Sequence, residues 1–304
     1  MRHAILRAGL PVLALLTLTA CSGDDAAESE AAVSSGEASA CPGEVLDVVV
    51  SVGAWGDVVR QLGGDCATVT TIAPEAEAPA EVAPADREAF TAADLVVVNG
   101  ARLDGWAADA AAAAGDPVVV SAAEVAGAVG QVRDPHLWYD PAVVPEVARE
   151  VALELARLSP DAAPYFDAQH TAWTTALQPW LEAVEALRAA SDGRAFAATG
   201  NAFDRLADAV GLTDATPSGY ARTVRTGGEP TRGELAEFET ALRGGAVDVL
   251  VQVGDDLPDG LDDAADEGEV PVVVITETPD EDTPFVEWQL AQLGALSEAL
   301  AEGR

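Results

Sequence analysis

Lysine is absent from this sequence, and histidine and cysteine occur only three times each in 304 residues. Without lysine, Schiff-base chemistry and a lysine-containing phosphate loop are excluded. The 16 basic residues are all arginine, and 52 acidic residues give a formal net charge of -36. This excess excludes a nucleic-acid partner, because affinity for the phosphate backbone comes mainly from basic side chains. Because 49% of the residues are apolar, the chain can still bury a large core.

Motifs of enzymatic catalysis are also missing. The sequence contains no G-x-S-x-G, G-x-G-x-x-G, Walker loop, C-x-x-C or H-E-x-x-H pattern. Its histidines, His3, His136 and His170, are too scattered to suggest a Ser-His-Asp site. An acidic hydrolase with paired carboxylates stays open, but no assembled nucleophile and base support it. We therefore expect a protein without enzymatic activity.

The first 20 residues have the pattern of a secretory signal peptide. Basic residues up to Arg7 precede an apolar run, residues 8–20, which is shorter than the roughly 20 residues of a membrane-spanning helix. The run ends in Leu18-Thr19-Ala20-Cys21, which resembles a bacterial lipobox. We predict a signal peptide over residues 1–20 and lipidation of Cys21. An ordinary signal peptide with a chance cysteine is the alternative.

Residues 22–40 show no hydrophobic periodicity and no aromatic side chain, which predicts a flexible acidic tether, assigned to residues 21–43. Cys41 and Cys66 are predicted to form a disulfide, since an extracytoplasmic compartment favours pairing. Such a bridge would contribute on the order of 3 kcal/mol in the chain-entropy model. Two free thiols are the alternative.

Strand-like and helix-like segments then alternate, and the strand-like runs carry apolar residues on both faces. This pattern predicts a parallel sheet covered on both faces by helices. We assign this N-terminal lobe to residues 44–140. Its predicted strands are residues 45–52, 67–72, 94–99 and 118–121, and its predicted helices are residues 55–62, 85–93 and 106–114.

Residues 141–191 break the alternation and read as helical, with an interruption at Ser159-Pro160. Their second part carries an apolar stripe at spacings of three, four and seven, and a helix spanning it would be roughly 40 Å long, enough to join two lobes. The alternation resumes in a C-terminal lobe, residues 192–304. We expect an α/β fold of two lobes with parallel sheets flanked by helices, joined by a long connecting α-helix. The predicted strands of the second lobe are residues 195–199, 220–224, 247–253 and 270–275, and its predicted helices are residues 202–210, 234–242, 257–266 and 285–301.

One loop carries the most informative residues, Asp134-Pro135-His136-Leu137-Trp138-Tyr139-Asp140-Pro141. It follows the last predicted strand of the first lobe, at the carboxyl edge where open α/β folds bind ligands. A histidine fixed between prolines and beside aromatic residues suits a metal ligand. By residue type alone, an exposed loop histidine without function is the commoner case.

The same octapeptide resembles the DPH-x-W-x-DP signature of the zinc and manganese substrate-binding proteins of bacterial ABC importers. Residues 48–65 and 93–100 are also similar to segments of that family. The resemblance extends from about residue 45 to the C-terminus. It implies a lipoprotein anchored to the outer face of the cell membrane, which captures a divalent metal ion between two lobes and delivers it to an ABC permease.

The resemblance carries over only part of the family's metal site, which uses about four side chains. His136 matches the second ligand, and Glu277 matches a carboxylate near the end of the chain. Ala80 and Gly200 stand where the family has its first and third ligands, and neither can coordinate a metal through its side chain. Oxygen donors in the gaps would favour manganese over zinc. The carboxylates that could fill them are Glu81, Asp86 and Glu277.

Two hypotheses follow for the function. In the first, the chain is an ABC-importer lipoprotein whose transported ligand is a zinc or manganese ion. In the second, it is an accessory or interaction lipoprotein of the same fold that has lost high-affinity metal binding. Because ligation requires a neutral imidazole, the first hypothesis predicts an affinity that falls below about pH 6.5.

Overall fold

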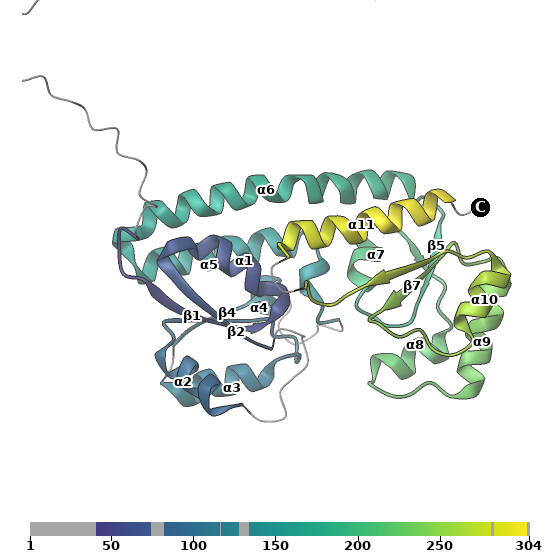
Figure 1. Ribbon diagram of the computed structural model, residues 1–304, viewed down its shortest axis with the longest axis horizontal. Helices are drawn as coiled ribbons and strands as arrows, with labels where there is room; N and C mark the ends of the chain where they lie inside the picture. Colours follow the sequence, from purple (N-terminus) through teal and green to yellow (C-terminus); the bar gives the residue numbers. More distant parts are fainter. Residues whose placement is uncertain (1–40, 74–81, 116, 128–133, 281–282, 303–304) are drawn as a thin grey trace, which may run out of the picture. The chain divides into compact units, whose positions relative to one another are not determined.

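Two parallel sheets with equivalent strand orders form the framework of the computed structural model, which describes residues 41–73, 82–115, 117–127, 134–280 and 283–302 (Figure 1). The first sheet has the order β2-β1-β3-β4 and the second the order β6-β5-β7-β8. Every strand pair in them is parallel. The strands are β1 (Leu46–Val52), β2 (Ala67–Ala73), β3 (Leu95–Val98), β4 (Val118–Ser121), β5 (Ala195–Ala198), β6 (Thr213–Asp214), β7 (Val249–Val253) and β8 (Val272–Ile275).

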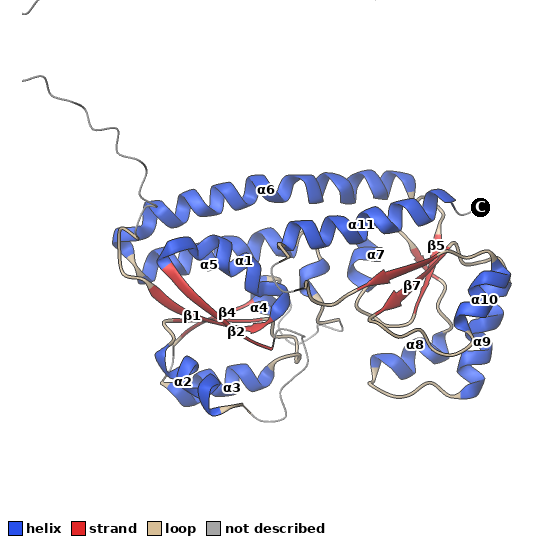
Figure 2. Cartoon of the chain, viewed as in Figure 1, coloured by secondary structure: helices blue, strands red, loops and turns tan. Residues whose placement is uncertain are grey.

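Helices connect the strands and cover the sheets, as parallel pairing requires (Figure 2). Those up to the connecting helix are α1 (Gly53–Gly63), α2 (Pro84–Ala92), α3 (Gly105–Ala114), α4 (Ala122–Val125), α5 (Val143–Leu158) and α6 (Ala163–Ala190). Those that follow are α7 (Asp204–Val210), α8 (Ser218–Arg225), α9 (Arg232–Arg243), α10 (Leu261–Gly268) and α11 (Phe285–Glu302). Short 3-10 helices are η1 (Gly64–Cys66), η2 (Leu137–Tyr139) and η3 (Pro160–Ala162).

The central strand β1 shows why the predicted strands are apolar on both faces. Successive side chains of a strand point to opposite faces of the sheet. Val48 and Val50 enter the hydrophobic cluster that includes α1 and α5, whereas Val49 packs with Phe90 of α2 and Ala107 of α3. In Figure 1, α1 and α5 accordingly lie on one side of this sheet and α2 and α3 on the other.

The second lobe is built in the same way. Leu250 of β7 packs in a cluster with Tyr220 of α8 and Phe238 of α9. Its neighbours Val249 and Val251 face the other side and join the cluster that contains residues of α6, α7 and α11. Both faces of this sheet are therefore covered, and the carboxyl ends of its strands form one edge.

Helix α6 joins the lobes, because it packs against α1 and α5 of the first and against α7 and α11 of the second (Figure 1). It is 28 residues long. The predicted apolar stripe is its buried face, which confirms the sequence-based interpretation. The buried residues are Phe166, Trp173, Leu177, Trp180, Val184 and Leu187.

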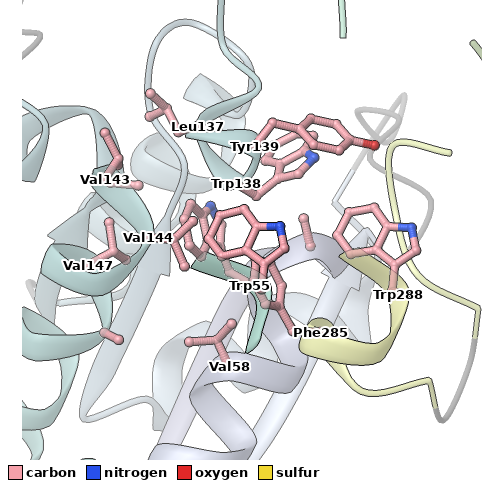
Figure 3. Packing of buried hydrophobic residues seen from close by; sticks show 14 of the residues in the cluster. Trp55, Val58, Leu137, Trp138, Tyr139, Val143, Val144, Val147, Phe285 and Trp288 are labelled. Atoms are coloured by element: carbon pink, nitrogen blue, oxygen red, sulfur yellow. The ribbon is translucent and has the colours of Figure 1, made fainter. Parts of the chain in front are cut away.

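This stripe belongs to one continuous hydrophobic cluster that contains strand residues of both sheets. Figure 3 shows part of it, where Trp55 and Val58 of the first lobe lie near Phe285 and Trp288 of α11. The rings of Phe285 and Trp180 meet edge to face with centroids 6.0 Å apart. One face of each sheet therefore contributes to a core that the two lobes share, and the opposite faces pack in separate clusters within each lobe.

Two segments of the second lobe differ from the prediction. Residues 220–224 were expected to form a strand but lie within α8, where Tyr220 and Val224 sit one helical turn apart and pack on the same cluster. Their aromatic and β-branched side chains favour strands in general, and here tertiary packing overrides that preference. Strand β6 was missed because its two residues are exposed and show no apolar pattern.

A disulfide connects Cys41 to Cys66, with an S–S distance of 2.07 Å, and so fastens the residues before β1 to η1. The predicted signal peptide, the lipidation site Cys21 and the tether up to residue 40 lie outside the described residues. Among the residues that are described, no helix is both long and apolar enough to cross a membrane.

Candidate functional site

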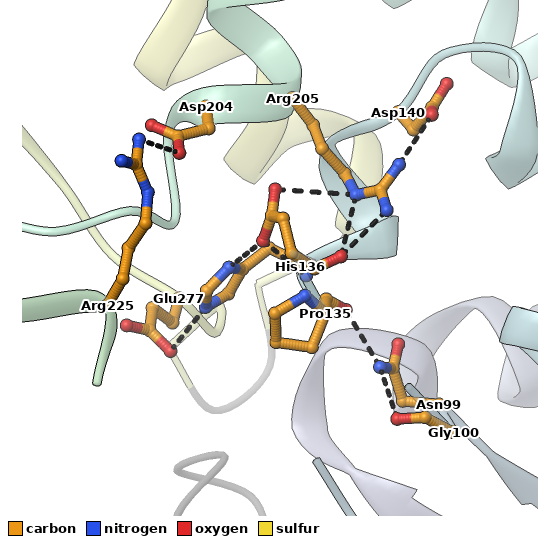
Figure 4. Close-up of polar contacts among 10 residues, drawn as sticks. Asn99, Gly100, Pro135, His136, Asp140, Asp204, Arg205, Arg225 and Glu277 are labelled. Atoms are coloured by element: carbon orange, nitrogen blue, oxygen red, sulfur yellow. Dashed lines mark hydrogen bonds and ion pairs between the residues drawn. The ribbon is translucent and has the colours of Figure 1, made fainter. Parts of the chain in front are cut away.

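The loop that carries His136 is attached to both lobes (Figure 4). From the first lobe, Asn99 Nδ2 donates to the carbonyl oxygen of Pro135 over 2.8 Å. From the second lobe, Arg205 Nη2 donates to the carbonyl oxygen of Asp134 over 2.7 Å. The three side chains of η2, which follow His136 directly, are fully buried. The loop is therefore a fixed element between the lobes.

His136 itself is only 5% exposed, which excludes the interpretation as an exposed loop histidine. Its Nδ1 atom lies 2.5 Å from Asp134 Oδ1, and its Nε2 atom lies 3.4 Å from Glu277 Oε2 (Figure 4). The ring of Trp138 meets the imidazole edge to face, with centroids 5.4 Å apart. A carboxylate on one ring nitrogen orients the other, and this arrangement is typical of metal-binding histidines.

Glu277 comes from the second lobe, shortly after the end of β8. The preceding residue, Thr276, is held in place by three side chains. Gln292 Oε1 accepts from the Thr276 backbone N–H over 2.9 Å, and Trp288 Nε1 donates to Thr276 Oγ1 over 2.9 Å. The hydroxyl of Tyr139 donates to the Thr276 carbonyl oxygen. Because Tyr139 lies on the His136 loop, the backbone on which Glu277 sits is tied directly to that loop.

Burial lowers the pKa of the His136 imidazole, but the hydrogen bonds to Asp134 and Glu277, together with the charges of these carboxylates, outweigh burial and raise the pKa to about 9. At neutral pH the metal-free ring is therefore protonated and lies between two carboxylates. This changes the pH dependence expected from sequence. In the metal-free protein the neutral imidazole, which metal ligation by this ring would require, predominates only above about pH 9, whereas an unperturbed histidine is mostly neutral above about pH 6.5.

Two of the predicted positions meet in space, and a third leaves no room for a side chain. His136 and Glu277 are brought together from opposite lobes. Gly200 follows β5, where an added Cβ would lie 2.9 Å from the Cβ of Val253. Real Cβ atoms essentially never approach another atom this closely, so a larger residue at position 200 would force the backbone or Val253 to shift. Residue 200 therefore lacks a metal-binding side chain, and the space that such a side chain would need is occupied by Val253.

In the described part of the chain, neither Asp86 nor His170 adds a further ligand to His136 and Glu277. Asp86 lies in the first turn of α2, and Ala80 and Glu81 lie outside the described residues. His170 is half-buried on α6, with Nε2 3.5 Å from Thr174 Oγ1. Over the residues that the structure describes, no group of three or more His, Cys, Asp or Glu side chains is placed to hold a metal ion.

Sequence reasoning missed the residues that orient His136. The motif begins with Asp134-Pro135 and ends with Asp140-Pro141, and this repetition around the histidine was a usable signal. Arg205 gave no signal, because it lies about 70 residues away on a helix with an ordinary apolar pattern. Only the folded chain places its guanidinium against the His136 loop.

Residues 48–299 match the family described as ZnuA, zinc-uptake complex component A, periplasmic. The chain belongs to this family. The ZnuA family consists of solute-binding proteins rather than enzymes; its members bind divalent metal ions as substrates and act outside the cytoplasm. The resemblance inferred from the DPH-x-W-x-DP motif is thereby confirmed.

One curated relative is the manganese-binding lipoprotein MntA of Halalkalibacterium halodurans, with 31% identity over 142 residues. The match covers 45% of this chain and 47% of that protein, so the chain matches about half the length of its relative.

Solved structures of other proteins share the fold. The metal-dependent lipoprotein YcdH from Bacillus subtilis superposes with a TM-score of 0.69 at 21% identity, over 83% of this chain and 99% of that one. A mutant of the laminin-binding adhesin Lmb from Streptococcus agalactiae gives a TM-score of 0.67 at 22% identity, over 84% and 99% of the two chains. These likenesses confirm the expected α/β fold of two lobes and a long connecting helix.

Proposed function

We propose that this ZnuA-family chain is an extracytoplasmic substrate-binding lipoprotein of an ABC importer, and that it captures a zinc or manganese ion between its two lobes. The observation that carries the proposal is the 3.4 Å approach of His136 Nε2 to Glu277 Oε2. These atoms belong to different lobes and different ligand types. They face each other in a contact that a divalent cation would replace.

The protonation state of the metal-free site agrees with this role. A proton on the imidazole neutralises part of the charge of the two flanking carboxylates, and a bound cation would take over that task. Binding at neutral pH should therefore release a proton from His136. Asp134 would keep the ring oriented in both states, because it contacts the nitrogen that faces away from Glu277.

The donor set bears on which ion is preferred. One imidazole and one carboxylate suit either zinc or manganese, and oxygen-rich sets favour manganese. Water would have to fill the coordination positions that these two side chains leave. Compared with a site of several histidines, this set should therefore discriminate less against manganese, in keeping with the name of the relative MntA. We also expect weaker binding than at a zinc site with four protein donors.

Anchoring and delivery rest on different observations. The lipobox-like segment that ends at Cys21 supports attachment to the outer face of the cell membrane. Membership of the ZnuA family supports an ABC permease in that membrane as the partner that receives the ion.

Titration of the metal-free protein with manganese and with zinc, followed by calorimetry, tests the site. We expect His136→Ala to weaken binding by more than about 100-fold, since losing a ligand should exceed the 10–100-fold cost of losing a partner behind it. His170→Ala is the matched control, because this half-buried histidine lies on α6 with Thr174 as its neighbour. Equal affinities for His136→Ala and the wild-type protein would contradict the proposal.

The close approach of Gly200 to Val253 favours a second candidate, an accessory lipoprotein without high-affinity metal binding. In that case the third ligand was lost and the space closed. Elemental analysis of natively purified protein separates the two functions. The first candidate predicts about one equivalent of manganese or zinc, and a thermal shift when either is added. The second predicts neither.

A further inference from the structure

Arg205 of α7 holds the His136 loop at two points. Its Nε and Nη2 atoms donate to the carbonyl oxygen of Asp134 over 3.2 and 2.7 Å, before the histidine. Its Nη1 atom donates to Asp140 Oδ2 over 3.0 Å, after the histidine. Nε also lies 3.4 Å from Asp134 Oδ2. One guanidinium thus bridges the two ends of a seven-residue loop that belongs to the other lobe (Figure 4).

We propose that Arg205 is a positioning residue for metal capture: it fixes the His136 loop of the first lobe against the second lobe, so that His136 faces Glu277 before the ion arrives. This inference rests on the proposed function, because it assigns a role at the same site. Arg205 touches neither the ion nor the ligand atoms. It acts on the backbone and carboxylate of Asp134, and through them on His136.

The chemistry of arginine suits this role. A guanidinium is planar and carries several donors in fixed directions, so one side chain can serve a carbonyl oxygen and a separate carboxylate together. Arg205 is partly enclosed, with 21% of its side chain exposed, so water competes with these bonds only in part. The loop is also held by Asn99 from its own lobe, through Pro135. Tyr139, at the far end of the loop, donates to the Thr276 carbonyl oxygen of the second lobe. Arg205 adds a second link to that lobe, and it is the one that holds Asp134, the residue that contacts the His136 ring.

Fixing ligands before binding saves the cost of ordering them when the ion arrives. A partner that orients a metal ligand typically contributes 10–100-fold to affinity. Without Arg205, the Tyr139–Thr276 contact would remain, but the Asp134 side of the loop would lose its attachment to the second lobe, and part of the alignment of His136 with Glu277 would have to be paid for on binding. Affinity would fall although no ligand atom has been removed.

The positive charge of Arg205 by itself predicts the opposite effect on metal affinity, so the experiment can distinguish positioning from charge. A positive charge near a cation site opposes binding, so removing it should tighten binding if charge alone mattered. Arg225 provides the matched control. Its Nη2 atom pairs with Asp204 over 2.8 Å and lies 3.7 Å from Asp214, both of which are second-lobe residues. Arg225→Gln removes the same charge without releasing the His136 loop.

The first experiment compares manganese affinity in the full protein. We expect Arg205→Gln to weaken binding about tenfold or more, and Arg225→Gln to leave it unchanged or slightly tighter. Arg205→Lys keeps the charge but loses the planar set of N–H donors that reaches Asp134 and Asp140 together, so this variant should also bind manganese more weakly than the wild type. A merely structural role would lower the melting temperature without changing the affinity of the folded protein. Unchanged or tighter binding by Arg205→Gln overturns the inference.

A second measurement does not depend on metal. In metal-free protein, the amides of Tyr139 and Asp140 donate within the loop to His136 and Leu137 carbonyl oxygens. We expect hydrogen exchange at these amides to be faster in Arg205→Gln than in Arg225→Gln, while exchange in β1 and β7 stays the same. Equal exchange in the two variants overturns the inference. If the wild-type protein binds neither manganese nor zinc, the proposed function fails, and this measurement still decides whether Arg205 fixes the loop.

Discussion

The two lobes repeat one strand order, and each places a candidate donor beyond its fourth strand. His136 follows β4 in the first lobe, and Glu277 follows β8 in the second. Because both sheets are parallel, these positions lie at their carboxyl edges, where such folds bind ligands. The sequence shows no repeat between the lobes, so this equivalence is a property of topology alone.

The lobes differ in how firmly they hold their donors. The His136 side chain is 7% exposed and contacts Asp134, whereas the Glu277 side chain is 39% exposed. The family resemblance also predicts ligands after two other strands, but the sequence has Gly200 after β5 and Ala80 after β2. Only the two fourth-strand positions carry the side chains that the family resemblance predicts. The two lobes thus contribute different kinds of donor: His136 is buried in a fixed loop, and Glu277 is accessible to solvent.

The largest effect should come from breaking the core that the lobes share. Trp180 of α6 is fully buried and packs on Phe285 of α11, so Trp180→Ala should cost about 3–5 kcal/mol of unfolding free energy. Because the hydrophobic cluster is continuous, we expect a single unfolding transition at a lower temperature. Calorimetry measures this, with the exposed Gln178→Ala as control. Separate transitions for the two lobes would contradict a shared core.

The next effect tests the buried donor, His136, through the pH dependence of stability. The pKa of His136 is raised from 6.5 to about 9, so the protonated ring stabilises the fold fully below pH 6.5 and loses this contribution as the pH rises through about 9. At about 1.4 kcal/mol per pKa unit, the loss amounts to about 3 kcal/mol. Urea unfolding of metal-free protein across this range should show the loss in the wild type and not in His136→Gln. Parallel pH profiles would contradict the imidazolium between two carboxylates.

A smaller effect tests the closed position in the second lobe. Gly200→Ala would bring a Cβ to 2.9 Å from the stiff Val253 side chain, and such overpacking should cost about 1–3 kcal/mol. Gly105→Ala in the first lobe is the control, since nothing lies within 4 Å of its added Cβ. We expect the control to be neutral or slightly stabilising. Chemical denaturation of both variants measures the difference, and equal stabilities would show that space at residue 200 has been retained.

Much of the fold could be predicted because its signals are local. The valine-rich interior strands β1, β3 and β7 are buried on both faces, and the stripe on α6 follows helical spacing, so composition and periodicity suffice for both. Prediction failed where packing decides, as at residues 220–224. The site was only half predictable for the same reason. His136 lies in a recognisable motif, but Arg205 acts through contacts between residues about 70 positions apart.

The disulfide between Cys41 and Cys66 determines where a pull from the N-terminus would enter the fold. Strand β1 follows Cys41 closely and occupies an interior place in its sheet, between β2 and β3. Without the covalent link, tension along the preceding chain would act first on β1 and tend to peel it from its neighbours. With the link, that load is shared with η1 and with the start of β2, which follows Cys66 directly, so it no longer falls on β1 alone.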